Sequence, residues 1–260
     1  MSIEFMADLD FAGQVQRLLF PKSSPVCDWN CIGVKNRMAQ EVGGDFFDFI
    51  TMPDNCQIVF IGDVTGHGLR ASVVMSLLYG FIYRSAMQAC SALDVVQQTN
   101  RFLQTFAART ESLDHLFSST LFFGIIMPDT LEMQYVNAGH PAPLVRRGTD
   151  LFALEATAPP VGFFANPEIA MGTFRFAKGD RILFYTDGIT ELVNPNGELF
   201  GVERMRQFLK QETGDHQEFL DSLYMSLHDF GRGEMIRDDC TAIVIDLHGD
   251  WRQSRFSQNM

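Results

Sequence analysis

The stretch IGDVTGHGLRASVV, residues 61–74, joins two kinds of hydrophobic pattern. The apolar run before Asp63 has the composition of a strand, and the spacing of apolar residues from Leu69 onward is helical. Asp63 therefore lies at a strand end, and Gly66 allows a tight turn before the helix. Such a turn suits either a phosphate cradle of backbone amides or a metal site whose carboxylate lies at a strand end.

Other aspartates occupy similar positions. Asp45 follows two glycines in VGGDFFD, Asp187 follows an apolar run in LFYTDG, and Asp238 and Asp239 precede the apolar run IVI. Strand ends of one core can converge, and clustered carboxylates repel one another unless a cation lies between them. Hard divalent ions such as Mg²⁺ and Mn²⁺ prefer oxygen ligands, so the set favours a metal site. Because a single Asp-Gly after a strand is usually only a turn, the spacing alone leaves both interpretations open.

Other chemistries fit the motifs less well. The segment GDVTGHG lacks the Lys-Ser/Thr of a P-loop and does not match G-x-G-x-x-G. An aspartyl phosphotransferase would need a second aspartate at Tyr185, and the chain has no G-x-S-x-G motif of a serine hydrolase. His67 and His140 lie among turn residues, where each is either a loop hydrogen-bonding group or a proton donor near neutral pH.

Composition excludes several classes of protein. The 260 residues carry a formal net charge of −12, which argues against binding to nucleic acid or to an anionic membrane surface. The 24 phenylalanines favour packed layers of structure. The five scattered cysteines are interpreted as reduced packing residues. With no signal peptide and no apolar run long enough to span a bilayer, the sequence predicts a cytoplasmic protein without membrane insertion.

The order of the predicted elements indicates the fold class. Helices are predicted at 3–20, 69–82, 91–108, 203–210 and 217–230, and strands in the segments STLFFGIIM, LEMQYVNA, APLVRR, LFALE, DRILFYTDG and DDCTAIVIDL. Ser91 and Asp94 are predicted to form a capping box, and the apolar stripe of 69–82 is predicted to lie on a sheet. Consecutive helices followed by consecutive hairpins favour an α+β fold with antiparallel sheets and helices outside.

Six motifs carry a family resemblance. In chain order, EVGGDFFDF, GDVTGHGLRAS, NAGHPAPL, LFYTDGITE, GELFG and DDCTAIVI resemble the PPM-type metal-dependent serine/threonine protein phosphatases, in the bacterial SpoIIE/RsbU-like branch. The resemblance covers about residues 18–247. It implies a four-layer α/β/β/α sandwich with two central antiparallel sheets. It also implies a linker helix at 1–20, a phosphatase domain at 21–248 and a tail at 249–260.

The resemblance also implies a site with two Mn²⁺ or Mg²⁺ ions. Asp63 would bridge the ions, and the carbonyl of Val64 would complete one coordination shell. The implied catalytic residues are Asp45, Asp63 and His67. The implied metal ligands are Asp45, Asp63, Val64, Asp187 and Asp238, with Asp239 as the alternative to Asp238. The implied substrate-binding residues are Arg37, Gly66 and Gly188.

The implied activity is dephosphorylation of a phosphorylated STAS-domain anti-sigma-factor antagonist in a partner-switching pathway. The alternative is a pseudophosphatase that docks a partner without turnover, and the retained aspartates favour the enzyme. The helix at 3–20 is interpreted either as a cap on the core or as a homodimer contact that transmits regulation. Residues 193–237, a turn-rich loop followed by helices, are predicted to read the protein surface around the phosphoserine.

Overall fold

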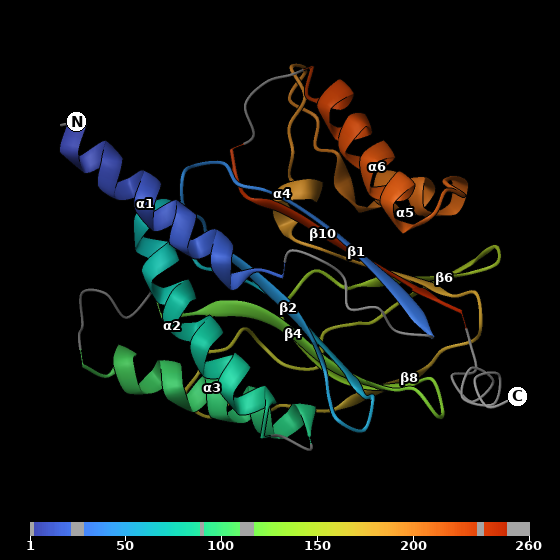
Figure 1. Ribbon diagram of the computed structural model, residues 1–260, viewed down its shortest axis with the longest axis horizontal. Coiled ribbons are helices and arrows are strands. Elements are labelled where there is room, and N and C mark those ends of the chain that lie inside the picture. Colours follow the sequence, from blue (N-terminus) through green and yellow to red (C-terminus); the bar gives the residue numbers. More distant parts are fainter. Residues whose placement is uncertain (1–2, 22–28, 89–90, 110–116, 233–236, 249–260) are drawn as a thin grey trace, which may run out of the picture.

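Two five-stranded sheets lie at the centre of the molecule (Figure 1). The computed structural model describes residues 3–21, 29–88, 91–109, 117–232 and 237–248. The sheet that we call the β10 sheet contains, in spatial order, β1 (Asn30–Arg37), β10 (Cys240–Leu247), β9 (Arg181–Tyr185), β6 (Leu144–Arg147) and β7 (Asp150–Ala153). The other, the β3 sheet, contains β2 (Asp45–Thr51), β3 (Gln57–Val64), β4 (Ser119–Met127), β5 (Glu132–Ala138) and β8 (Gly172–Arg175). Every neighbouring pair of strands is antiparallel.

Helices cover the outer faces of both sheets (Figure 1). On the β3 sheet lie α2 (Gly68–Ala86) and α3 (Ala92–Ala107), with α1 (Ile3–Leu19) against α2. On the β10 sheet lie α4 (Asp187–Thr190), α5 (Gly201–Gln211) and α6 (His216–Phe230). This arrangement confirms the predicted four-layer α/β/β/α sandwich.

The central strands are apolar on both faces because both faces are covered. In β9, Ile182 and Phe184 belong to the core between the sheets, whereas Leu183 and Tyr185 belong to the core beneath α5 and α6. A strand buried on both sides reads as a continuous apolar run without polar alternation. The phenylalanines contribute much of the core between the sheets, including the stacked pair Phe60 and Phe123 from β3 and β4.

Only part of the predicted apolar stripe of α2 lies on the sheet. Val74 and Leu78 are buried in the core, as predicted. The row formed by Leu69, Val73 and Leu77 is instead exposed, at 42%, 55% and 46%. The prediction that this row packs on the sheet is wrong, because the stripe is wider than the face of the helix that the β3 sheet can cover.

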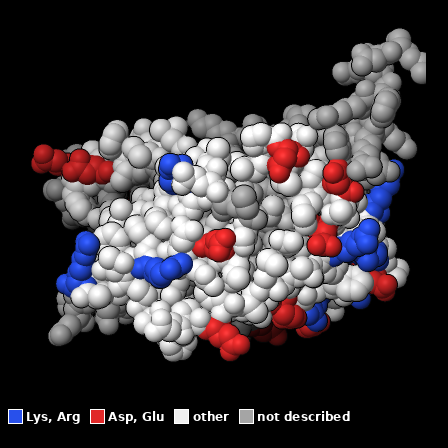
Figure 2. Space-filling view, turned by 90° about the horizontal axis from the view of Figure 1, so that it is seen from below, with Lys and Arg blue, Asp and Glu red and all other residues white. Residues whose placement is uncertain are grey.

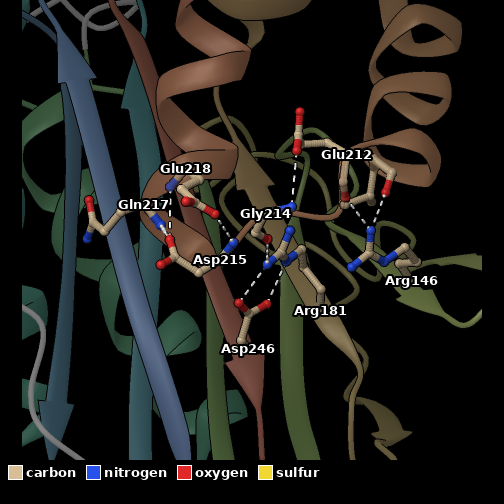
Figure 3. A network of polar contacts seen from close by, with 9 residues as sticks. Arg146, Arg181, Glu212, Gly214, Asp215, Gln217, Glu218 and Asp246 are labelled. Carbon is tan, nitrogen blue, oxygen red and sulfur yellow. Dashed lines mark hydrogen bonds and ion pairs between the residues drawn. The ribbon is translucent and has the colours of Figure 1, made fainter.

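The predicted capping box of α3 does not form. Ser91 is the N-cap residue of α3, but its side chain makes no cap hydrogen bond. A capping box normally needs Glu or Gln at the third helical position, and Asp94 has a shorter side chain. A complete box caps α6, where the Asp215 carboxylate accepts from the Glu218 amide and the Glu218 carboxylate accepts from the Asp215 amide (Figure 3).

A buried arginine joins β9, β10 and the connection between α5 and α6 (Figure 3). Arg181 is 4% exposed and lies opposite Asp246 in the β9–β10 ladder. Its guanidinium donates to both carboxylate oxygens of Asp246, at 2.6 and 2.7 Å, and to the Gly214 carbonyl oxygen at 2.7 Å. The bidentate geometry compensates a charge that would otherwise be costly to bury.

We expect Asp246→Ala to lower the free energy of unfolding by about 3 kcal/mol, because Arg181 keeps its buried charge and loses the carboxylate. Urea unfolding monitored by circular dichroism measures the change. The matched control is Asp221→Ala, which removes the exposed pair between Asp221 and Lys35 and should cost less than about 1 kcal/mol. Equal losses in the two variants would contradict the role given to the buried network.

Cys56 and Cys240 are free thiols, in agreement with the prediction for the cysteines. Cys27 and Cys90 lie outside the described residues. Within the described ranges, no helix has both the length and the apolar character needed to cross a membrane.

Candidate metal centre and active site

A cavity of about 910 Å³ brings aspartates from three sequence motifs together. The described residues that line it are Asp63, Thr65, Gly66, His67, Gln104, Ala107, Ala108, Ser118, Thr120, Pro160, Gly162, Phe163, Asp187 and Asp238. Asp63 lies near the end of β3, Asp187 begins α4 directly after β9, and Asp238 precedes β10. The cavity therefore lies where strands of both sheets end. Its described lining contains no Lys and no Arg.

The aspartates of the cavity have raised pKa values. Burial, and then repulsion from Asp187 and Asp238, raises the pKa of Asp63 to about 8. Burial, with repulsion from Glu191, also raises the pKa of Asp187. The pKa of Asp238 is raised chiefly by burial and further by the charge of Asp187. The cavity therefore concentrates negative charge that its described lining residues do not neutralise.

Backbone oxygens add to this set beside Gly44. A Cβ atom at Gly44 would lie 2.7 Å from Asp63 Oδ1, 3.0 Å from the Val64 carbonyl oxygen and 3.4 Å from the Gly66 carbonyl oxygen. Carboxylate and carbonyl oxygens are the donors that hard divalent cations prefer, so these residues fit Mg²⁺ or Mn²⁺. Across the described ranges, no three His, Cys, Asp or Glu side chains close into a ready ligand group.

Asp45 lies behind Asp63 and joins the two sheets. It is opposite Asp63 in the β2–β3 ladder and is 1% exposed. Its Oδ2 atom accepts hydrogen bonds from the hydroxyl groups of Thr186 and Thr241, on the side of the β10 sheet. Burial and the charge of Asp63 raise the pKa of Asp45 well above its ordinary value. Asp45 thus adjoins the cavity without being one of its lining residues.

The structure separates the roles of Asp238 and Asp239. Asp238 lines the cavity, whereas Asp239 is 4% exposed. Both carboxylate oxygens of Asp239 are already used by the backbone: Oδ1 accepts from the Ala39 amide at 2.8 Å and Oδ2 from the Gly44 amide at 2.9 Å. Of the two neighbours, Asp238 is therefore the better placed to ligate a metal.

The turn at residues 43 and 44 is also held from α1. Gln16 is 3% exposed, and its side-chain amide donates to the Gly43 carbonyl oxygen at 3.0 Å. Its Oε1 atom accepts from the Gly43 amide at 3.1 Å. Gln16 and Asp239 together fix the backbone directly before Asp45.

Gly66 and His67 line the cavity, as the sequence predicted. Gly66 has φ +93°, a left-handed conformation that favours glycine. The His67 Nδ1 atom lies 3.2 Å from Gln40 Nε2. This contact turns one ring nitrogen toward Gln40 in the loop before β2.

Arg37 and Gly188, which the family resemblance implies as substrate-binding residues, are not among the described residues that line the cavity. Arg37 lies opposite Cys240 in the β1–β10 ladder and lines a separate small cavity with Tyr224 of α6. A Cβ at Gly188 would lie 2.1 Å from the Asp239 carbonyl oxygen, so this glycine allows close packing.

Thr120 is a lining residue that sequence reasoning missed. It lies opposite Asp63 in the β3–β4 ladder, and its hydroxyl oxygen accepts from the Asp63 amide at 3.1 Å. The same hydroxyl lies 3.1 Å from Nδ1 of His140. Burial lowers the pKa of His140 to about 3, so this side chain is neutral and supports Thr120. The structure therefore does not support the alternative of His140 as a proton donor near neutral pH.

The family assignment follows from the match between this sequence and a family model. The model of the family described as Stage II sporulation protein E (SpoIIE) matches residues 53–248, more than half of the chain. The chain belongs to the SpoIIE family. The segment that matches the SpoIIE model includes Asp63, Asp187 and Asp238, the three aspartates of the cavity.

The proteins similar to this chain include a phosphoserine phosphatase, and the fold of this chain resembles that of a PP2C domain. Protein IcfG of Synechocystis sp. (strain ATCC 27184 / PCC 6803 / Kazusa) is 28% identical over 92% of this chain and 41% of its own length. Phosphoserine phosphatase RsbP of Bacillus subtilis (strain 168) is 28% identical over 80% of this chain and 50% of its own length. This chain thus spans about half or less of these two relatives. The SiaA-PP2C domain of Pseudomonas aeruginosa has a TM-score of 0.81 at 17% identity, covering 95% of this chain and 98% of that domain.

The raised pKa of Asp63 predicts how the metal-free protein responds to pH. The folded state holds a proton on Asp63 up to about pH 8, whereas the unfolded state releases it near pH 4. The resulting contribution to stability is present at low pH and is lost as the pH rises toward 8. In the presence of a chelator, the free energy of unfolding of the wild type should decrease between pH 5 and pH 8. The decrease should be about 2–4 kcal/mol larger in the wild type than in Asp63→Asn. Thermal unfolding at several pH values in this range measures the difference, and Asp221→Asn is the control. Parallel curves of stability against pH for the wild type and Asp63→Asn would contradict the prediction.

Proposed function

We propose that this chain is a metal-dependent protein phosphatase that removes phosphate from phosphoserine or phosphothreonine. The observation that carries the proposal is the cavity in which three aspartates meet with no Lys or Arg in its described lining. A phosphate dianion would be repelled by such a cavity, so substrate binding requires a cation. The membership of the chain in the SpoIIE family, among the PP2C-type phosphatases, supports the same assignment.

We assign Asp63, Asp187, Asp238 and the Val64 carbonyl oxygen to hold the metal. Mn²⁺ or Mg²⁺, two ions in the family pattern, would stabilise charge on the phosphoryl oxygens and lower the pKa of bound water. Asp45 acts from behind this set, as a buried carboxylate fixed by two threonine hydroxyls. Such support for ligating side chains maintains their orientation.

His67 is proposed as the residue that gives a proton to the serine oxygen as it leaves. Among the described lining residues it is the one imidazole, and it lies in the loop that follows Asp63. General acids of this kind need to reach the leaving oxygen, and the position of His67 at the cavity wall permits that contact. Gly66, beside it, keeps the loop backbone in a conformation that brings both residues to the cavity.

The proposed substrate is a serine-phosphorylated STAS-domain anti-sigma-factor antagonist in a partner-switching pathway. The relative RsbP, a phosphoserine phosphatase by name, supports the substrate class. The test is phosphate release from a phosphorylated STAS-domain protein with Mn²⁺ and with excess chelator. Release that depends on the metal supports the proposal. Binding of the phosphoprotein without release under any metal would instead establish a pseudophosphatase.

We also propose that α1 and α2 contact a second copy of the chain. Phe11 is 67% exposed and Val15 44% exposed on α1, and they line one groove with the exposed row of α2. Adjoining exposed apolar side chains on two helices form a continuous surface that a second copy could bury. On the same helix Leu9 and Leu19 are half-buried, and Leu19 packs against the core between the sheets.

Phe11→Glu with Val73→Glu is expected to turn a dimer into a monomer and to change metal-dependent turnover, because α2 begins directly after the loop that contains His67. Light scattering on the eluting protein gives the mass, and phosphate release gives the turnover. The control is Met225→Glu, an equally exposed apolar position on α6. A wild-type protein that is already monomeric, or unchanged mass in the double variant, would leave α1 as a simple cap on the core.

A further inference from the structure

Two phenylalanines at the rim of the cavity are held out toward solvent. Phe163 is 65% exposed and Phe164 is 51% exposed, and their rings meet edge to face with centroids 4.8 Å apart. Phe163 is also a lining residue of the cavity that contains Asp63. An exposed aromatic pair beside a cavity is a feature that marks binding surfaces.

Side chains of α3 fix the backbone on both sides of Phe163. The Gly162 amide donates to Asn100 Oδ1 at 2.7 Å, and Asn100 Nδ2 donates to the Phe164 carbonyl oxygen at 3.1 Å. The side-chain amide of Gln104 donates to the Gly162 carbonyl oxygen. Asn100 is 2% exposed, so its hydrogen bonds lie in a buried setting where they are costly to break.

The residues before Phe163 are anchored as firmly. Val161 and Ser119 exchange two backbone hydrogen bonds, at 3.0 and 2.9 Å. Gly162 has φ +81°, and a Cβ there would lie 2.0 Å from the Phe117 carbonyl oxygen, so only glycine fits. These contacts hold the backbone at Phe163 at the rim of the cavity.

The wall that Phe163 forms is uncharged. Its other described members are Ala107 and Ala108 at the end of α3, and Pro160 before the loop. Figure 2, which views the molecule from the side where α3 lies in Figure 1, shows Lys, Arg, Asp and Glu scattered over a largely uncharged face and gathered mainly toward its edges. The cavity thus has an acidic side at the aspartates and an apolar side at Phe163.

We propose that this apolar wall binds an apolar side chain of the phosphoprotein substrate, next to the phosphorylated residue. The inference rests on the proposed function. If the phosphate of the substrate is bound at the aspartates, the substrate chain next to the phosphorylated residue must cross the rim of the cavity. A wall without charge favours an apolar neighbour over an acidic one, which the aspartates also repel. Phe163 is then a specificity-determining residue.

This placement differs from the one predicted from the sequence. Residues 193–237 were expected to read the protein around the phosphoserine, yet no described residue of that segment lines the cavity. The apolar side of the cavity is instead formed by the end of α3 and by residues 160–163.

Two synthetic phosphoserine peptides test the proposal, one with leucines flanking the phosphoserine and one with serines in their place. In the wild type, the leucine peptide should have the higher kcat/KM. Phe163→Ala should lower kcat/KM about tenfold for the leucine peptide, through KM, and less than about twofold for the serine peptide. Phe163→Leu should restore most of the difference, and Met225→Ala, which removes an exposed side chain on α6, should change neither value.

Equal losses on both peptides, no change on either, or a lower mass of Phe163→Ala in solution would overturn the proposal. The last result would show that the rings are buried against a second copy. If the wild type hydrolyses neither peptide under any metal, the proposed function fails on its own account. The apolar wall is then still tested by the Kd of fluorescently labelled peptides, which should differ between wild type and Phe163→Ala only for the leucine peptide.

Discussion

Asp63→Asn is expected to reduce Mn²⁺-dependent phosphate release by at least about 10³-fold while the protein stays folded. Asn keeps the size of the side chain and removes one negative charge from the oxygen set beside Gly44. The loss falls on metal binding and on the charge that the metal neutralises at the phosphate. Circular dichroism should show an unchanged fold, since the Asp63 backbone keeps its place between β2 and β4.

Asp187→Asn tests the same assignment from the other sheet, because Asp187 follows β9 and Asp63 lies on β3. Its turnover should also collapse at saturating Mn²⁺. Asp221→Asn, an exposed carboxylate on α6, provides the control and should keep wild-type activity. Wild-type turnover in either cavity variant would refute the metal assignment. Equal loss of turnover in the control would point to a general effect of charge.

The second large effect distinguishes neighbouring aspartates. Asp239→Ala is expected to lower the free energy of unfolding by about 3 kcal/mol, because the buried amides of Ala39 and Gly44 each lose their acceptor. Asp238→Ala should leave stability within about 1 kcal/mol, since Asp238 faces the cavity and its removal also relieves repulsion. The same Asp238 variant should lose metal-dependent turnover.

Urea unfolding in a chelator and phosphate release at saturating Mn²⁺ together measure this contrast. Two results would contradict it: a stable Asp239→Ala variant, or an Asp238→Ala variant with normal turnover. Asp239→Asn provides a milder comparison, because it keeps one acceptor oxygen and should recover part of the lost stability.

The layered fold could be predicted because the patterns that specify it are local. The helix of 69–82 and the strand STLFFGIIM each carry their own signal, and both are present as α2 and β4. Among the elements absent from the predicted set, β8 and α4 are short, with four residues each. Four residues are too few to establish a hydrophobic period, and their structure depends on the neighbours that they pack against.

The candidate site was predicted only in part, for a different reason. Aspartates at strand ends are visible in the sequence, but which carboxylate faces the cavity depends on partners far along the chain. Asp239 binds the Gly44 amide, 195 positions away, and that contact decides that Asp238 faces the cavity. Thr120 had no signal beyond its strand pattern, since its role comes from its register with Asp63.

The hydrogen bonds between Gln16 and Gly43 bear on where the phosphatase unit can be cut. The boundary at residue 20, drawn from the sequence, treats α1 as separable from the domain that follows. Removing α1 would take away the side chain that satisfies both backbone groups of Gly43, one residue before the Gly44 amide that Asp239 binds. A fragment that starts at residue 21 would therefore begin with a loosened turn before Asp45. We therefore expect the smallest autonomously folding unit of this chain to include its first helix.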